Sequence, residues 1–308
     1  MLLCFALLAL RCASYPPPPF GFAARALTVS NAEVSVATFN VSQPGATRGV
    51  IRTIFIESGE LLWPNYDALR LRVYVDGDAP SAPSIDAPLG FFDEGDMSPW
   101  GAARLGNTGF AGAEYLRIPI PFYAAARVAL VQGQADSGTH TVRVAVTGAE
   151  EALLAPPGPR QRALTFALDA VAAPPGAPLA LFDSAPLRAR LPFATVAPTL
   201  VGLTVSGGNT SFFAGAVRVC VGGGSEPSCA PLSYGLESFF LAETGLGFAK
   251  YVTPVAGVTA KAILGQRIIA WRELDEWAGQ ESIVILWDVP ADAGVVAVSA
   301  VVWAAAVL

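Results

Sequence analysis

The chain has 308 residues, of which 53% are hydrophobic and 14% charged, and its net charge is −6 at pH 7. This length allows a large core and suggests about two domains. Because 25 acidic residues outnumber 19 basic ones and no basic stripe stands out, we expect no nucleic-acid partner. Ala, Val, Gly and Pro dominate, which favours short strands and turns over helices.

An apolar run opens the chain at residues 1–13. It is too short to cross a bilayer and is typical of a signal-peptide core, so we expect residues 1–14 to be removed on export. A basic segment before the run is missing, and the alternatives are an incorrectly chosen start codon or a buried N-terminal strand. The triplets Asn40-Val41-Ser42 and Asn209-Thr210-Ser211 are glycosylation acceptors and add to the prediction of a secreted protein.

Short segments with strand character follow one another along the first half. Residues 69–75 alternate cleanly, with Arg70, Arg72 and Tyr74 on one face and Leu or Val on the other. Asp76-Gly77 then supplies a turn. The other predicted strands of this half are 51–56, 115–120, 128–131 and 141–146.

Residues 150–162 are rich in Pro and Gly and indicate a linker or a long crossover, and 172–178 form a second such stretch. Strand character then resumes at 199–205, 216–221, 261–271, 282–287 and 295–303. Many short strands at intervals of about ten residues predict a sandwich or jelly roll, here twice over. We therefore expect an all-β protein with halves at 20–155 and 156–308.

Removal of residues 1–14 would leave Cys220 and Cys229 as the only cysteines. The turn-rich segment between them could bring the two sulfur atoms together, so a disulfide is expected in an oxidising compartment. Two free buried thiols are the alternative.

The chain ends on an apolar stretch, residues 294–308. It is short for a membrane helix, and the polar spacer that a glycolipid anchor signal needs is poor. Its β-branched content favours a closing core strand, with an anchor signal as the alternative.

Several common catalytic arrangements are absent from the sequence. His140 is the single histidine and has no nucleophile elbow beside it, and no Cys/His cluster has the spacing of a zinc site. The Gly222-Gly223-Gly224 run lacks the residues that complete a phosphate loop. We expect no metal and no cofactor. The carboxylates, aromatic residues and arginines that remain suit sugar binding or cleavage.

Glu237 is the strongest candidate for chemistry, because Ser238, Phe239 and Phe240 follow it directly. A carboxyl group beside aromatic rings is partly desolvated, which raises its pKa and suits acid–base or nucleophilic work. The alternative is an outward-facing Glu on an edge strand.

The order of several segments resembles the domain-of-unknown-function family 2961, classed with glycoside hydrolase family 172, whose enzymes cleave difructose anhydride and arabinofuranosides. Each segment is weak alone, and their order carries the resemblance. They are residues 44–47, 49–52, 69–77, 80–84, 88–92, 118–122, 233–240, 256–259 and 270–275.

The resemblance implies a tandem jelly roll that assembles as a homotrimer and acts on a furanoside glycan. It places Glu237 at the position of a catalytic glutamate, and Arg272 and Asp275 on a segment that contributes to substrate binding. Family members use a second glutamate upstream, as a double-displacement glycosidase requires. Here that position is Ala214, and Ser238 replaces the aspartate of the motif.

Two hypotheses follow from this departure. The first is a furanoside hydrolase in which Glu237 is the nucleophile and another acid, such as Glu243, Glu273 or Asp275, replaces the missing glutamate. The second is a non-catalytic member that binds glycan or forms a capsid-like structural trimer. Ala214 favours the second, because a site with one carboxylate lacks a group to protonate the leaving oxygen.

Overall fold

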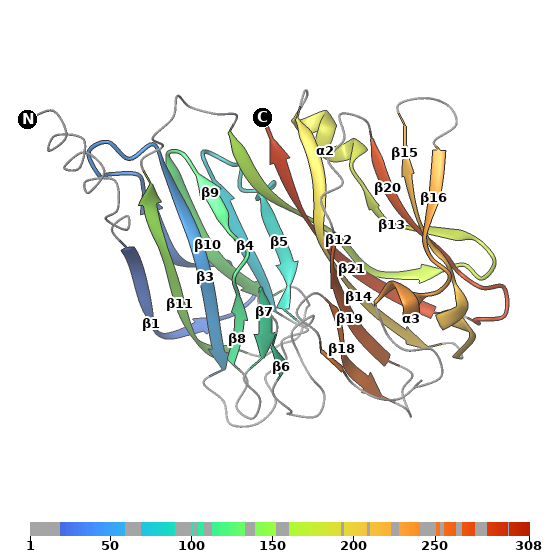
Figure 1. Cartoon of the computed structure of the whole chain (residues 1–308). Helices are drawn as coiled ribbons and strands as arrows, with labels where there is room; N and C mark the ends of the chain where they lie inside the picture. Colours follow the sequence, from blue (N-terminus) through green and yellow to red (C-terminus); the bar gives the residue numbers. More distant parts are fainter. Residues whose placement is uncertain are drawn as a thin grey trace, which may run out of the picture.

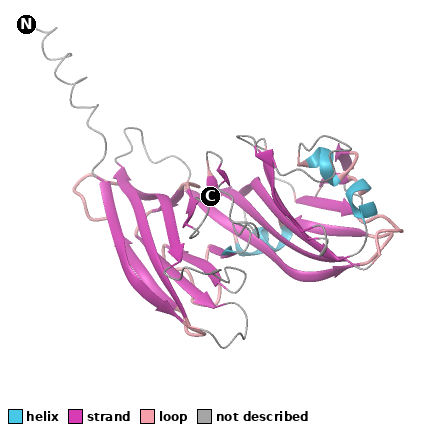
Figure 2. Ribbon diagram, turned by 90° about the horizontal axis from the view of Figure 1, so that it is seen from below, coloured by secondary structure: helices cyan, strands magenta, loops and turns pink. Residues whose placement is uncertain are grey.

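The computed structural model describes most of the chain from residue 19 onward, so the signal peptide expected at 1–14 lies outside the described residues. Two β-sandwiches lie side by side in it, the first drawn in blue to green and the second in yellow to red (Figure 1). Helical segments are short, and strands make up nearly all of the ribbon (Figure 2). The described ranges are 19–58, 69–89, 100–101, 104–107, 113–132, 139–151, 160–191, 194–207, 210–222, 228–240, 251–252, 256–262, 267–274, 282–294 and 296–308.

The first sandwich consists of a sheet in the order β1-β11-β3-β8-β7-β6, with β9 also paired to β3, and a sheet in the order β2-β10-β4-β5. Its strands are β1 (Pro19–Val29), β2 (Val34–Asn40), β3 (Arg48–Ser58), β4 (Leu69–Val75), β5 (Ile85–Pro88), β6 (Trp100–Gly101), β7 (Leu105–Asn107), β8 (Ala113–Leu116), β9 (Ile120–Phe122), β10 (Ala125–Gln132) and β11 (His140–Glu151).

The second sandwich consists of a sheet in the order β12-β21-β14-β19-β18-β17 and a sheet in the order β13-β20-β15-β16. Its strands are β12 (Gln161–Ala173), β13 (Pro178–Asp183), β14 (Thr195–Gly207), β15 (Val217–Val221), β16 (Ser228–Ser233), β17 (Tyr251–Val252), β18 (Ala256–Ala262), β19 (Arg267–Glu273), β20 (Ile283–Asp288) and β21 (Val296–Val307). The helical segments of this half are α2 (Ala185–Arg190), the 3₁₀ helix η3 (Thr210–Ala214) and α3 (Leu236–Phe239).

The two halves have the same strand order. The last strand of each half lies between the first and third strands of one sheet: β11 lies between β1 and β3, and β21 between β12 and β14. The next-to-last strand lies between the second and fourth strands of the other sheet, so that β10 separates β2 from β4 and β20 separates β13 from β15. A sandwich in which successive strands change sheets in this way is a jelly roll. The predicted double jelly roll is confirmed.

The strand β4 shows how the sequence pattern produces the sandwich. Leu69, Leu71 and Val73 are fully buried between the sheets, at 0–1% exposed. Arg70 and Arg72 alternate with them, face outward and form ion pairs with Asp86 of β5 (2.7 and 3.3 Å). Burial of every second side chain is what the alternating pattern predicts for a half-buried sheet.

Three predicted elements differ from the structure. The strand expected at 115–120 is interrupted between β8 and β9, where Pro119 has no N–H to donate to a ladder. The strand expected at 261–271 is a pair, because β18 ends at Ala262 and β19 begins at Arg267 and runs antiparallel to it.

The third difference is β12, which occupies residues expected in part to be linker. Its Ala- and Leu-rich sequence has little intrinsic strand preference, but it pairs with β21 from Gln161↔Val307 to Ala173↔Val296. Tertiary pairing overrides local propensity here. The apolar C-terminal stretch forms β21, which lies in the interior of its sheet between β12 and β14.

The two sandwiches share part of one hydrophobic core. The core of the first half continues into residues of the second sandwich, and these include the buried Trp271 and Trp303. Polar contacts cross the same junction: the Asp86 N–H donates to Thr165 Oγ1 (2.7 Å) and the Thr165 N–H donates to the carbonyl of Ser84 (2.9 Å). The junction is therefore packed and hydrogen-bonded, and it joins the halves as a single block.

Candidate functional site

The segment that carries Glu237 forms the one-turn helix α3 instead of a strand or loop. The Phe239 and Phe240 amides donate to the carbonyls of Gly235 and Leu236, both at 2.9 Å. Leu236, Phe239 and Phe240 are all buried in the second core and anchor the turn. The backbone of Glu237 is thereby held within this turn, while its side chain lies outside what the structure describes.

The helix η3, which ends at Ala214, lies against the start of α3. A Cβ atom added at Gly235 would lie 2.6 Å from the Phe213 carbonyl oxygen and 3.6 Å from Ala214 Cα. Glycine at 235 is what allows this close approach. The structure thus places Ala214 next to the turn that contains Glu237. Ala214 is exposed and supplies a methyl group where a second carboxylate is expected.

Arg272 of β19 also contacts α3. Its Nη1 donates to the Phe239 carbonyl (2.5 Å), and its guanidinium lies 5.0 Å from the centre of the Phe239 ring. A cation at the C-terminal end of a helix satisfies a carbonyl that has no partner within the helix. Arg272 therefore positions α3 directly. Asp275, predicted beside it, lies outside the described residues.

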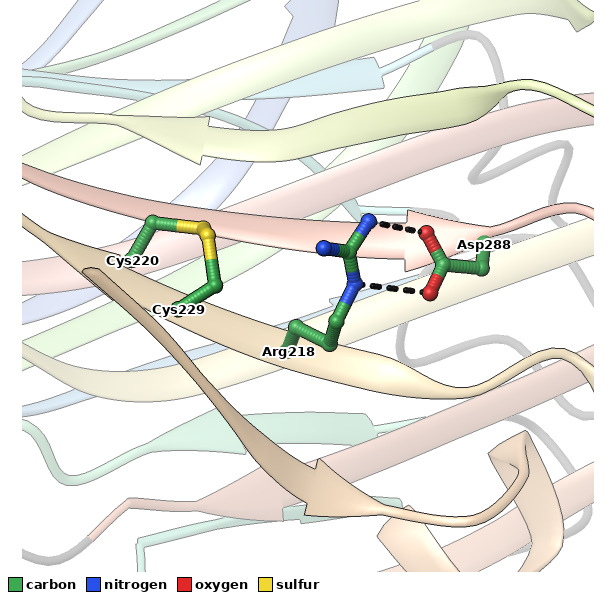
Figure 3. Close-up of a disulfide and its surroundings, with 4 residues drawn as sticks. All are labelled: Arg218, Cys220, Cys229 and Asp288. Carbon is green, nitrogen blue, oxygen red and sulfur yellow. Dashed lines mark hydrogen bonds and ion pairs between the residues drawn. A yellow bond between two sulfur atoms is a disulfide. The ribbon is translucent and has the colours of Figure 1, made fainter. Parts of the chain in front are cut away.

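The two cysteines of the second half are bonded to each other. Cys220 of β15 and Cys229 of β16 are directly opposite partners in the ladder, with Cα atoms 3.9 Å apart (Figure 3). This separation is below the range of about 4.4–6.8 Å usual for disulfides. Two residues along β15, Arg218 forms a bidentate ion pair with Asp288 (2.5 and 2.7 Å).

A cavity lies elsewhere, at the junction of the two sandwiches, and it is lined by residues of both. It has a volume of about 530 Å³. Apolar side chains from both halves form much of its wall, among them Val50, Ile118, Ala163 and Trp303. Five arginines and one carboxylate also line it: Arg48, Arg52, Arg104, Arg117, Arg162 and Glu151. We call this cavity the junction cleft.

The arginines of the junction cleft come from separate elements, and sequence reasoning missed them. Arg48 and Arg52 lie on β3, Arg104 and Arg117 flank β7 and β8, and Arg162 lies on β12. No local motif links them. A signal was available in composition, because all basic residues except Lys250 and Lys261 are arginine. Arginine is the residue of choice for planar, bidentate recognition of carboxylate and phosphate.

Glu151 is the centre of the ion pairs in the cleft. Arg48 and Arg52 donate to its two oxygens at 2.7 and 2.8 Å. Burial alone would raise the pKa of Glu151, but the hydrogen bonds from Arg52 and Arg48 outweigh it and hold the pKa below its usual value. Glu151 is therefore a carboxylate at neutral pH and unsuited to donate a proton.

Within the described residues, no helix has both the length and the apolar character needed to cross a bilayer. The same residues contain no group of three or more His, Cys, Asp or Glu side chains arranged to hold a metal ion.

No family model matches the chain, and no curated protein matches it. Among solved structures it is similar to the Sputnik virophage, with 10% identity, a TM-score of 0.33 and coverage of 95% of this chain and 86% of that one. A second similar structure is that of the triple jelly roll fold and turret assembly in an archaeal virus, with 7% identity, a TM-score of 0.26 and coverage of 96% of this chain and 60% of that one. The tandem CBM51 modules of a family 98 glycoside hydrolase from Streptococcus pneumoniae have 8% identity, a TM-score of 0.22 and coverage of 92% and 82%. Because these TM-scores are low, the fold assignment rests on the strand order of the chain itself.

Proposed function

We propose that the protein is a structural subunit that assembles into a capsid-like homotrimer. The observation that carries this proposal is the tandem arrangement of two jelly rolls with the same strand order, joined through a shared core. Jelly rolls serve as building blocks of viral capsids and also as lectin domains, so the fold admits a structural role and a glycan-binding role.

Rigidity of the block supports the structural role. Arg162 of β12 reaches into the first half, where it donates to Ser84 Oγ (2.8 Å) and the Val75 carbonyl (3.0 Å) and forms an ion pair with Asp78. On the outer face, Arg70 of β4 pairs with Asp169 of β12 (2.9 Å). A subunit whose halves are held in one orientation can repeat the same contacts in every copy of an assembly.

The repeated sandwich is compatible with a trimer. A three-fold ring is one of the closed point-group arrangements that soluble homo-oligomers adopt. Three copies of a chain that contains two like sandwiches would present six sandwiches around the three-fold axis. Tyr234 is 93% exposed beside α3, and aromatic residues are enriched at protein interfaces. It is a candidate contact.

Sedimentation-velocity analysis and negative-stain electron microscopy of the purified protein test this proposal. We expect a species of three times the 31.9 kDa chain mass. We also expect Tyr234→Ser to shift it towards monomer, while Gln43→Ser on a distant exposed loop leaves it unchanged. A wild-type protein that is monomeric at its highest soluble concentration would contradict the proposal.

A second candidate is a site at α3 that holds a furanoside glycan without cleaving it efficiently. The contact between η3 and α3 favours it, because Ala214 and the Glu237 turn then belong to one surface. Assays with aryl α-arabinofuranosides and fructofuranosides test it. We expect little turnover by the wild type, none by Glu237→Gln and a gain for Ala214→Glu. Turnover that survives Glu237→Gln would reject a catalytic role for this glutamate.

We also propose that the protein is exported to an oxidising compartment, and the paired Cys220 and Cys229 support this. Peptide mapping of protein from its natural source, without reduction, would detect the linked pair, whereas alkylation of both thiols would contradict export.

A further inference from the structure

We propose that the junction cleft binds a small organic anion, with an apolar body between the two sandwiches and a phosphate or carboxylate held by the arginines. This inference does not depend on the assembly proposed above. The cleft volume of about 530 Å³ lies within the range of about 300–1,000 Å³ typical of small-molecule sites.

The cleft carries more positive charge than its neighbours neutralise. Arg48 and Arg52 share Glu151, Arg104 pairs with Glu273 (3.4 Å), and Arg162 pairs with Asp78. Arg117 has no carboxylate partner among the described residues; its guanidinium lies 4.9 Å from the centre of the Tyr115 ring. Among the described residues, five arginines thus face three carboxylates, which leaves two positive charges in a chain whose net charge is −6.

The positions of the arginines suit an anion at the rim of the cleft. The Arg117 amide donates to the Arg104 carbonyl (2.6 Å), so these two residues are side by side. Residues 48, 50 and 52 alternate along β3, and all three line the cleft. The Arg52 side chain is 55% exposed, and Arg117 is also exposed. Both guanidinium groups are therefore accessible to a ligand at the rim.

The apolar wall indicates the rest of the ligand. Val50 and Ile118 come from the first half, and Ala163, Trp303 and Ala304 come from the second. A free inorganic ion would leave this surface exposed to water, whereas an apolar body would bury it. Guanidinium groups bind phosphate and carboxylate in the same bidentate manner, so the chemistry shared by both groups defines the ligand class. The net charge of −6 favours a small molecule over a nucleic-acid strand.

Isothermal titration calorimetry of the full chain with 1-naphthyl phosphate tests the proposal. Inorganic phosphate and 1-naphthol are titrated in parallel as the two partial ligands, one without the apolar body and one without the charge. 1-Naphthoic acid is the carboxylate counterpart. We expect one naphthyl phosphate per chain, weaker binding at high salt, and weaker binding of both partial ligands. Removal of one charged hydrogen-bond donor should weaken binding by about 10- to 100-fold, so we expect this loss for Arg117→Gln and for Arg52→Gln.

Arg143→Gln is the matched control, because Arg143 is an exposed arginine of β11 outside the cleft whose nearest carboxylate is Glu57 (3.6 Å). It should bind as the wild type does. The comparison of 1-naphthyl phosphate with 1-naphthoic acid distinguishes the two anionic groups. Equal binding of uncharged 1-naphthol, unchanged affinity in both cleft variants, or an equal loss in Arg143→Gln would overturn the proposal.

Discussion

At the scale of single residues, Glu150 shows how one buried carboxylate orders a loop. The amides of Ser42 and Gln43 donate to its Oε2 (2.9 and 2.7 Å), and the Ser42 hydroxyl donates to Oε1 (3.0 Å). The hydrogen bond from the Gln43 amide, followed by those from Ser42, holds the pKa of Glu150 below its ordinary value of 4.5 despite burial. The loop after β2 is thus tied to the end of β11.

The first prediction concerns this carboxylate. Because the folded-state pKa is depressed, Glu150 contributes stability above its unfolded-state pKa and loses that contribution as the pH falls through the lower folded-state value. We expect Glu150→Ala to lower the free energy of unfolding by about 1 kcal/mol at pH 7. This is the low end for a lost charged acceptor, because the hydrogen bonds to Glu150 are only partly buried.

Urea denaturation at pH 7 and at pH 3 measures this effect. The difference between wild type and Glu150→Ala should shrink at the lower pH, while Glu150→Gln, which can still accept the two amide hydrogen bonds, should lie between them. A difference that stays constant with pH would show that the charge of Glu150 does not contribute.

At the scale of elements, the hairpin of β15 and β16 lies at the edge of its sheet, since β16 has one neighbour in the sheet. Its disulfide joins residues nine apart in sequence and closes a short loop. A crosslink of this length restricts the unfolded chain by roughly 2.5 kcal/mol in the loop-entropy account. The ladder to β20 holds β15 independently, from Val217↔Trp287 to Val221↔Ile283.

The second prediction follows from that arrangement. The double variant Cys220→Ala, Cys229→Ser should keep the fold but lower the free energy of unfolding by roughly 2–3 kcal/mol. Thermal melts with and without reductant measure the loss. Reductant should lower the midpoint of the wild type to that of the variant and leave the variant itself unchanged. Equal melting of all four samples would show that the disulfide adds nothing to stability.

At the scale of the whole molecule, the shared core and the Arg162 contacts predict that both jelly rolls unfold together. The Asp78 side chain is 5% exposed, and its Oδ2 also accepts the amides of Val75 and Ser84 (3.0 and 2.8 Å). Loss of the guanidinium would leave this buried carboxylate without its charged partner.

The third prediction is that scanning calorimetry of the wild type shows one transition. Arg162→Ala should lower the free energy of unfolding by roughly 3 kcal/mol. This is the smaller end of the range for a broken buried ion pair, because two backbone amides still donate to Asp78. The variant should also show separate transitions for the two halves. Arg143→Gln again serves as the exposed control. Two resolved transitions in the wild type would mean that the junction does not couple the jelly rolls.

The sequence by itself determined the fold class and much of the strand pattern. Alternation at 69–75 and the turn at Asp76-Gly77 act through the nearest residues along the chain, so they can be recognised locally. Both residues of this turn have positive φ, 51° and 85°. Local signals also marked Cys220 and Cys229 as a pair across a turn. They failed at β12, whose strand conformation depends on β21, more than a hundred residues later.

Only the tertiary structure decided which strands pair, how the two halves join and where the arginine side chains cluster. Gly49 is an example: a Cβ atom there would lie 2.1 Å from Cζ of Phe122, a ring on the neighbouring strand that the sequence does not associate with it. Arg48, Arg117 and Arg162 meet at one cleft although they belong to three separate segments. Sequence patterns report the period of each strand, whereas a site between sandwiches arises from contacts between residues distant in the chain, which local periodicity does not encode.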